Sequence, residues 1–308
     1  MSVFLQGEGG EVATTSSSSS GAALPVPECR NYRSSCSHDE MNPKRRSTME
    51  DCHRIIPALG GDDCLSYFGV YDGHGGRQIV DFLETTLENN VAEELRQPDD
   101  AAIPERLARA FLITDMQSRR ADITTSGATA VSVLIKADAN ANTKELYCAN
   151  VGDSRAVLAC REKRGKADGS GLEWGYVGKR LSYDHRADDE DEQKRIKDAG
   201  GFIIRARVLG ILAVSRSFGD HGLKDFVTAN PHVSQVTMKS ADEHPFLILA
   251  CDGVWDVFTD QEAVDFLLDE FSRAPDRAFT EADAARLLVL ASIERGSADN
   301  ITAIVVYF

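Results

Sequence analysis

The sequence has no apolar run that approaches the roughly 18 residues needed for a membrane helix. Residues 1–6 lack the basic flank and the long apolar stretch of a signal peptide, and Ser2 stands where N-myristoylation requires glycine. The seven cysteines are odd in number and irregularly spaced, which favours free thiols over a disulfide framework. We therefore expect a protein of the cytoplasm or nucleus without membrane attachment, with unconventional secretion as the open alternative.

Basic residues are also scarce, with 34 Lys and Arg against 49 Asp and Glu and a formal net charge of −15. Binding to a nucleic-acid backbone needs basic surface, so we expect no nucleic-acid partner. A serine-hydrolase elbow is lacking, because neither Ser126 nor Ser215 lies in a Gly-x-Ser-x-Gly sequence. The excess acid has two interpretations, general solubility or a preference for basic partners.

The most informative segment present is Phe68-Gly-Val-Tyr-Asp-Gly-His-Gly-Gly76. Its first residues are typical of a buried strand, and the glycines allow the chain to turn sharply afterwards. Asp72 is therefore expected at the end of the strand, where functional groups are common. A glycine beside it also lets a backbone carbonyl approach a cation closely. Alone, an Asp-Gly turn is more often structural than functional.

Other acidic residues flank strand-like runs in the same way. Glu50 and Asp51 follow Arg46, and Asp153 follows the run 146–151. Asp252 follows the apolar run 246–251, and Asp299 precedes the run 301–307. Any one of these could be a solvated turn, but together they predict a shared site.

Such a cluster constrains its own chemistry, because five neighbouring carboxylates repel one another unless cations compensate. Oxygen ligands without a Cys or His pair fit Mg²⁺ or Mn²⁺ rather than Zn²⁺, and two such ions can activate a bridging water for phosphoryl chemistry. Arg46 could bind phosphate in bidentate fashion, and His74 could protonate the leaving oxygen. The composite predicts a phosphate-ester hydrolase. The clustered residues are Glu50, Asp51, Asp72, Asp252 and Asp299.

In this order the motifs strongly resemble the metal-dependent protein serine/threonine phosphatases of type 2C. The match runs from about residue 29 to residue 308. Each motif is short, but eight in family order make coincidence improbable. The motifs are Arg46 with Met49-Glu-Asp51, Asp72-Gly-His-Gly-Gly76, Ser126-Gly-Ala-Thr129-Ala, Gly152-Asp-Ser-Arg-Ala-Val157, Leu212-Ala-Val-Ser-Arg216, Phe218-Gly-Asp220, Asp252-Gly-Val-Trp-Asp256 and Asp299-Asn-Ile-Thr302.

The resemblance implies a role for each matched residue. It implies that Asp72 bridges two metal ions and that the carbonyl of Gly73 coordinates one of them. Asp252 and Asp299 would hold the other ion, while Glu50 and Asp51 would act mainly through metal-bound water. Arg46 matches the phosphate-binding arginine and His74 the proposed general acid. Asp153 and Asp256 match a weaker third metal site.

Periodicity predicts the elements around the site. Helices are expected at 79–95 and 104–119 and after Asp260 and Thr280, with strands at 129–135, 145–151, 155–160, 246–251 and 301–307. Long helices grouped between strand runs favour an α+β layered domain. The resemblance implies a four-layer αββα sandwich, two antiparallel β-sheets flanked by helices, with the metal site in a cleft at one edge.

Domain organisation follows from composition. Residues 1–28 are rich in Ser, Gly and Ala, cannot bury enough apolar surface to order, and predict a flexible tail, either passive or regulated by phosphorylation. The motifs near Arg46 and Asp299 must meet, so residues 29–308 are expected to form a single catalytic domain. Two departures from the family lie inside it: Ala187, where lysine and proline usually follow the Asp-His pair, and residues 161–178, interpreted as a long strand connection.

The sequence thus predicts hydrolysis of phosphoserine and phosphothreonine in proteins by a metal-activated bridging water, with no phosphoenzyme intermediate. Phosphoproteins are the expected substrates, and the enzyme is expected to be a monomer. The alternative is a catalytically silent phosphatase-like binding module. That alternative would usually have lost a metal carboxylate or the arginine, and this chain retains them all.

Overall fold

The computed structural model describes residues 31–138, 143–165, 171–238, 240–273 and 280–308. The Ser-rich tail at 1–28 lies outside these residues, so its flexibility and the domain boundary after it stay predictions. Among the described helices, none combines the length and the apolar character that crossing a membrane requires.

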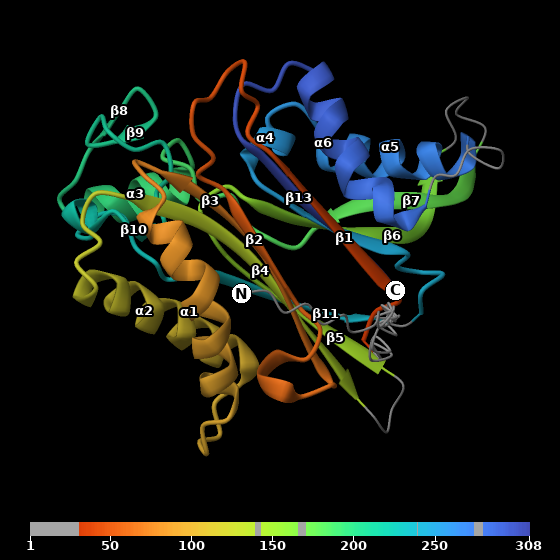
Figure 1. Cartoon of the computed structure of the whole chain (residues 1–308), viewed down its shortest axis with the longest axis horizontal. Helices are drawn as coiled ribbons and strands as arrows, with labels where there is room; N and C mark the ends of the chain where they lie inside the picture. Colours follow the sequence, from red (N-terminus) through yellow and green to blue (C-terminus); the bar gives the residue numbers. More distant parts are fainter. Residues whose placement is uncertain (1–30, 139–142, 166–170, 239, 274–279) are drawn as a thin grey trace, which may run out of the picture.

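Two antiparallel sheets form the centre of the molecule (Figure 1). Neighbouring strands pair antiparallel throughout both sheets. The five-stranded sheet runs in the order β1 (Ser34–Glu40), β13 (Ile301–Tyr307), β12 (Phe246–Ala250), β6 (Arg155–Gly165) and β7 (Leu172–Arg180). The six-stranded sheet runs β11 (His232–Met238), β5 (Thr143–Val151), β4 (Gly127–Asp138), β3 (Leu65–His74) and β2 (Cys52–Ile56), with β10 (Phe218–Gly219) pairing to β4.

Helices cover the outer face of each sheet (Figure 1). Those on the six-stranded sheet are α1 (Gln78–Leu95) and α2 (Ile103–Arg120). Those on the five-stranded sheet are α4 (Asp252–Trp255), α5 (Asp260–Arg273) and α6 (Ala284–Glu294). The remaining elements are α3 (Glu190–Asp198), the hairpin β8 (Ile203–Ile204) and β9 (Arg207–Val208), and the short 3₁₀ turns η1 (Leu59–Gly61), η2 (His221–Leu223) and η3 (Glu281–Asp283).

Three hydrophobic layers hold this arrangement together. The middle one lies between the sheets and includes Phe68, Leu249 and Ile304, each with no exposed surface. The outer layers join each sheet to its helices; Leu83 of α1 and Leu288 of α6 are fully buried in them. The expected four-layer αββα sandwich of two antiparallel sheets flanked by helices is confirmed.

Most predicted elements occur within a few residues of their expected bounds. The run 301–307 is a strand in full, and α1 buries Ile79, Leu83, Leu87 and Val91 on one face as its periodicity predicted. The helix expected after Thr280 begins as the 3₁₀ turn η3 and becomes α-helical only at Ala284.

The interpretation of residues 161–178 as a connection was wrong. β6 continues to Gly165, and β7 returns in register, with Cys160 opposite Val177 and Arg161 opposite Tyr176. Charged residues interrupt the apolar alternation that would have predicted these strands. In the structure Arg161 and Lys163 lie over the ring of the exposed Trp174. Backbone pairing, not apolar alternation, makes this hairpin at the sheet edge.

Candidate metal centre

Asp72 lies at the end of β3, the strand that the glycine-rich segment predicted. β3 pairs with β4 up to His74, so Asp72 faces Thr129 across the sheet. Gly73 follows where the backbone passes close to its neighbours: a Cβ there would lie 2.5 Å from both the carbonyl oxygen of Glu50 and Cγ2 of Val80. Only glycine fits between that loop and α1.

Asp51 lies behind Asp72, at the entry to β2. Its Oδ2 accepts a 2.8 Å hydrogen bond from the hydroxyl of Thr302 on β13, and only 2% of the residue is exposed. Carboxylate atoms of Asp51 and Asp72 lie within 4.8 Å of each other and of the Cys251 sulfur. Cys251 is fully buried and burial raises the pKa of its thiol, so it is a neutral neighbour without the access that redox sensitivity needs.

Asp252 is the first residue of α4 and is separated from the end of β12 by a single residue, and Asp299 lies just before β13. The two segments approach closely because Gly253 has no side chain; a Cβ there would overlap the carbonyl oxygen of Asn300. The side chain of Asn300 in turn secures the loop that carries Glu50. Its Nδ2 donates to the Thr48 carbonyl at 2.9 Å, and its Oδ1 accepts from the Glu50 N–H at 2.9 Å.

These elements enclose a cleft of about 240 Å³ at one edge of the sandwich. Asp72, Gly73, His74, Asp252 and Asp299, all expected at the site, line it together with Arg46 and Asp153. The remaining lining residues are Thr129, Arg207, Leu212, Ala213 and Val214.

Three expected site residues lie apart from the cleft wall. Asp51 is packed beneath it, whereas Glu50 lies at the side, with its Oε1 accepting from the Thr48 hydroxyl at 3.2 Å. Asp256 is exposed and does not line the cleft, although its charge acts on Asp153 and Asp252. The structure therefore brings one of the two candidate third-metal residues to the cleft.

Arg46 projects from an exposed loop into the cleft, where its guanidinium pairs with Asp299 and donates to the Ala298 carbonyl at 3.3 Å. A guanidinium has five N–H groups. Two are used in these contacts, which leaves three for an oxyanion in the same cleft.

Burial and mutual repulsion raise the pKa values of the clustered carboxyls. For Asp72 burial is the largest cause, followed by the charges of Asp252 and Asp51. The pKa of Asp252 is likewise raised well above its usual range by burial and then by Asp153 and Asp299. Burial raises the pKa of Asp51 to about 6 even though Thr302 donates a hydrogen bond to it. These groups are costly to ionise together without a compensating charge.

The donor set fits a hard divalent cation. Oδ1 of Asp252 is shielded from solvent and has no hydrogen-bond partner among the described residues. A buried carboxylate oxygen without a partner is destabilising, whereas the same oxygen directed at Mg²⁺ or Mn²⁺ is satisfied. Oxygen donors dominate the cleft, as such an ion requires.

Sequence reasoning gave no role to three residues that organise this site. Asn300 and Thr302 follow Asp299 in its motif, and Asp220 ends the motif Phe218-Gly-Asp220. Oδ2 of Asp220 lies 2.8 Å from Nε2 of His74. Arg207 lines the cleft from the β8–β9 hairpin, and its sequence context offered no signal.

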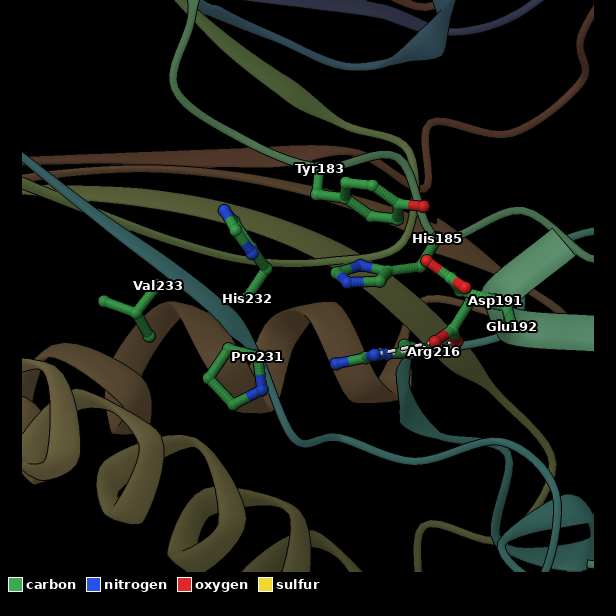
Figure 2. A pocket seen from close by; sticks show the side chains of 8 residues that line it. All are labelled: Tyr183, His185, Asp191, Glu192, Arg216, Pro231, His232 and Val233. Atoms are coloured by element: carbon green, nitrogen blue, oxygen red, sulfur yellow. Dashed lines mark hydrogen bonds and ion pairs between the residues drawn. The ribbon is translucent and has the colours of Figure 1, made fainter. Parts of the chain in front are cut away.

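A second cavity of about 310 Å³ lies away from this cluster, between β11 and the start of α3 (Figure 2). Its buried Glu192 is bound by Arg216 and Arg195 and accepts from the Ser215 hydroxyl at 2.6 Å. Arg216 extends beneath the ring of His185 in this view. Its charged residues are paired as in a structural ion-pair network, and His185 lines this cavity rather than the acidic cleft.

The neighbouring Ala187 is fully buried, and its N–H donates to the Ala213 carbonyl at 2.7 Å. Proline could not make this bond. The departure from the family motif is therefore accompanied by a backbone contact that holds residues 182–187 beside the cleft wall.

A two-sheet sandwich with buried carboxylates and an arginine around one edge cleft defines a class, the metal-dependent phosphate-ester hydrolases. The family model for protein phosphatase 2C matches residues 36–301. Protein phosphatase 2C homolog 1 of Schizosaccharomyces pombe is 34% identical over 308 residues, covering 97% of this chain and 81% of the relative. Its namesake in Saccharomyces cerevisiae is 35% identical over 286 residues, covering 87% and 91%.

Among solved structures, the serine-threonine phosphatase 2C from Toxoplasma gondii matches with a TM-score of 0.67 and 22% identity, covering 89% of this chain and 94% of that one. This likeness supports the fold. The chain belongs to the protein phosphatase 2C family, which confirms the resemblance drawn from the motifs. It is accordingly a metal-dependent protein serine/threonine phosphatase, and phosphoproteins are its substrates.

Proposed function

We propose that the edge cleft hydrolyses phosphoserine and phosphothreonine with two Mg²⁺ or Mn²⁺ ions. The observation that carries this proposal is the buried Oδ1 of Asp252, which has no hydrogen-bond partner in the described part of the chain and lies within a group of carboxyls of raised pKa. Asp72, Asp252, Asp299 and the backbone carbonyl of Gly73 would hold the ions. Glu50 and Asp51 complete the acidic set at the side and beneath.

Bound ions would supply the Lewis acidity that activates water and offsets charge on the phosphate oxygens. Side chains of the protein bind the phosphate, orient the water and transfer the proton. Arg46 offers three N–H groups to the phosphate oxygens and orients the phosphorus for in-line attack. Asp51, fixed by Thr302, orients the attacking water.

His74 lines the cleft and is the proposed general acid. As the water oxygen bonds to phosphorus, the ester P–O bond breaks and the departing oxygen takes a proton from His74. One proton of the water stays on the phosphate and the other is returned to His74. The products are the free hydroxyl of the protein and hydrogen phosphate, with no covalent phosphoenzyme.

Asp153 and Asp256 are proposed as a weaker third cation site. Asp153 is 6% exposed, lines the cleft and pairs with Arg186 at 3.1 Å. Burial is the main cause that raises the pKa of Asp153 to about 6, and Asp256 adds to the shift. With Arg186 already paired to Asp153 and Asp256 exposed, a third ion would bind less tightly than the first two.

We further propose that the enzyme works as a monomer in the cytoplasm or nucleus, without nucleic-acid or membrane partners, in signalling by dephosphorylation. The scarcity of basic residues supports the expectation that nucleic acid is not a partner. The silent binding module gains no support, since all the proposed metal and phosphate residues are present.

The test measures turnover of a phosphothreonine peptide and of an aryl phosphate by the chelated enzyme, before and after Mn²⁺ or Mg²⁺ is restored. We expect activity only with metal, and loss of about 10³-fold or more for Asp72→Asn and Asp252→Asn because each removes a metal oxygen. Undiminished turnover after thorough chelation would contradict the proposal, and inactivity with metal on both substrates would favour the binding module.

A further inference from the structure

The side chain of His74 is held by a carboxylate that comes from a distant part of the chain. Asp220 follows β10, and its Oδ2 lies 2.8 Å from Nε2 of His74. The Asp220 side chain is only 11% exposed, whereas that of His74 is 32% exposed. The carboxylate is thus the more buried partner, and His74 lines the cleft whereas Asp220 does not.

The pair forms in a space that the fold keeps free of side-chain atoms. On β4, Gly127 pairs with His74 of β3 on one side and with Gly219 of β10 on the other. A Cβ on Gly127 would overlap both the Asp220 carboxylate and Nε2 of His74. A glycine at position 127 therefore leaves the space in which the side chains of His74 and Asp220 meet.

Asp220 is fixed by contacts that do not involve the acidic cleft. The Ser217 hydroxyl donates to its Oδ2 at 2.6 Å, and its own N–H donates to the Ser126 carbonyl at 3.1 Å. Its φ of 46° and ψ of 38° are left-handed, which is uncommon for a residue with a side chain. A conformation of this kind persists only where surrounding contacts impose it.

A partly buried ion pair anchors the same turn to α2. Lys224 pairs with Asp115 at 2.9 Å and donates to the Ser217 carbonyl at 2.8 Å, while the Gly219 N–H donates to Asp115 at 2.9 Å. Burial would raise the pKa of Asp220, but the hydrogen bonds from His74 and Ser217 and the charge of Lys224 lower it overall. An anionic carboxylate therefore faces the imidazole.

We propose that Asp220 is a positioning residue for His74, holding the imidazole so that Nδ1 serves the leaving oxygen in the cleft. Nε2–H donates to Asp220 throughout, so Nδ1 is the nitrogen that gives up its proton when the ester P–O bond breaks. Asp220 stays ionised and exchanges no proton. This inference rests on the proposed acid role of His74.

A purely structural role is the competing explanation, since the contact also ties β10 to β3. The two roles differ in their dependence on the leaving group. A poor leaving group, such as the alkoxide of threonine, needs a well-placed acid, whereas an activated aryl oxide departs without one. Loss of structure would impair both substrates alike.

The experiment measures kcat and KM of the Mn²⁺-loaded full chain on a phosphothreonine peptide and on p-nitrophenyl phosphate. The variants are Asp220→Asn, His74→Ala and the double variant, with Asp225→Asn as the control, because Asp225 is exposed and lies in the same segment. We expect Asp220→Asn to lower kcat on the peptide roughly 10- to 100-fold, with KM unchanged and less than about a 3-fold change on the aryl phosphate. In the His74→Ala background the same substitution should add nothing, since Asp220 acts through the imidazole.

Equal losses on both substrates, or additive losses in the double variant, would overturn the inference. Should Asp220→Asn unfold, Ser217→Ala replaces it, because this variant removes one hydrogen bond from the Asp220 carboxylate. We expect Ser217→Ala to give a smaller loss of kcat, confined to the peptide substrate. A loss of kcat on both substrates, or no loss, would then overturn the inference. Failure of the proposed function itself is seen separately, as absence of Mn²⁺-dependent aryl phosphate hydrolysis by the wild-type enzyme.

Discussion

At the scale of single residues, this protein treats buried carboxylates in two opposite ways. Glu192 is surrounded by partners, with Arg216 and Arg195 bound to its oxygens and Ser215 donating to one of them. Burial would raise its pKa, but these partners lower it to about 2. Among the described residues no arginine or lysine forms an ion pair with Asp72 or Asp252, and the pKa values of these two carboxyls rise. Glu192 is thus part of a structural ion-pair network, whereas the raised pKa values of Asp72 and Asp252 mark the metal centre.

The Glu192 interpretation predicts a pH-dependent stability. A carboxyl whose folded pKa of about 2 lies below its ordinary value of 4.5 stabilises the fold above pH 4.5 and loses that contribution as the pH falls toward 2. Glu192→Gln should therefore lower the free energy of unfolding at pH 6, and its difference from wild type should shrink by about 2 kcal/mol between pH 6 and pH 3. Urea unfolding across that range measures the difference.

Glu190→Gln is the matched control, because Glu190 is exposed on the same helix. Its difference from wild type should stay near zero at every pH. A gap between Glu192→Gln and wild type that does not change with pH would show that the ion pairing around Glu192 is not what depresses its pKa.

The sequence predicts the cleft residues Asp72, Gly73, Asp252 and Asp299 because each lies beside a strong strand pattern. It could not predict what holds them in place. The partners of Asn300 lie 250 and 252 positions away in the chain, at Glu50 and Thr48. A hydrogen bond between such distant segments leaves no local periodicity, and the same holds for the contact between His74 and Asp220.

At the scale of elements, close backbone approach decides how the site is assembled. The segment that begins α4 meets the one that precedes β13 at Gly253, where any Cβ would overlap the Asn300 carbonyl. Strand ends carry the ligands, and glycines let those ends come together. Predicting the strands from the sequence therefore also predicted the site residues at their ends. The β6–β7 hairpin was not predicted, because its charged residues give no apolar alternation.

Gly253→Ala should lower the free energy of unfolding by about 1–3 kcal/mol, because the methyl group forces two backbones apart. The same shift separates Asp252 from Asp299, so affinity for Mn²⁺ should fall as well. Chemical denaturation and metal titration measure the two effects. Gly222→Ala is the control, since a Cβ there has no atom within 4 Å and should change stability by less than about 0.5 kcal/mol. If Gly253→Ala were as stable as the wild type, the close approach of Gly253 to the Asn300 carbonyl would be contradicted.

At the scale of the whole molecule, the metal centre joins the two sheets. Asp72 belongs to β3 of the six-stranded sheet, while Asp252 and Asp299 adjoin β12 and β13 of the five-stranded one. The apolar layer between the sheets, with Phe68 and Ile304 fully buried, sets their separation. Repulsion among the carboxylates at the edge opposes the apolar packing between the sheets. Cations bound at the edge would offset this repulsion.

The most direct measurement of this account is calorimetric titration of Mn²⁺ into the chelated wild-type chain and its Asp252→Asn variant. We predict about two ions per wild-type chain and the loss of at least one in Asp252→Asn, because the substitution alters a buried carboxylate whose Oδ1 has no partner among the described residues. Asp225→Asn, exposed and away from the cleft, should bind as wild type does. Unchanged stoichiometry and affinity in Asp252→Asn, or no binding by the wild type, would contradict the account.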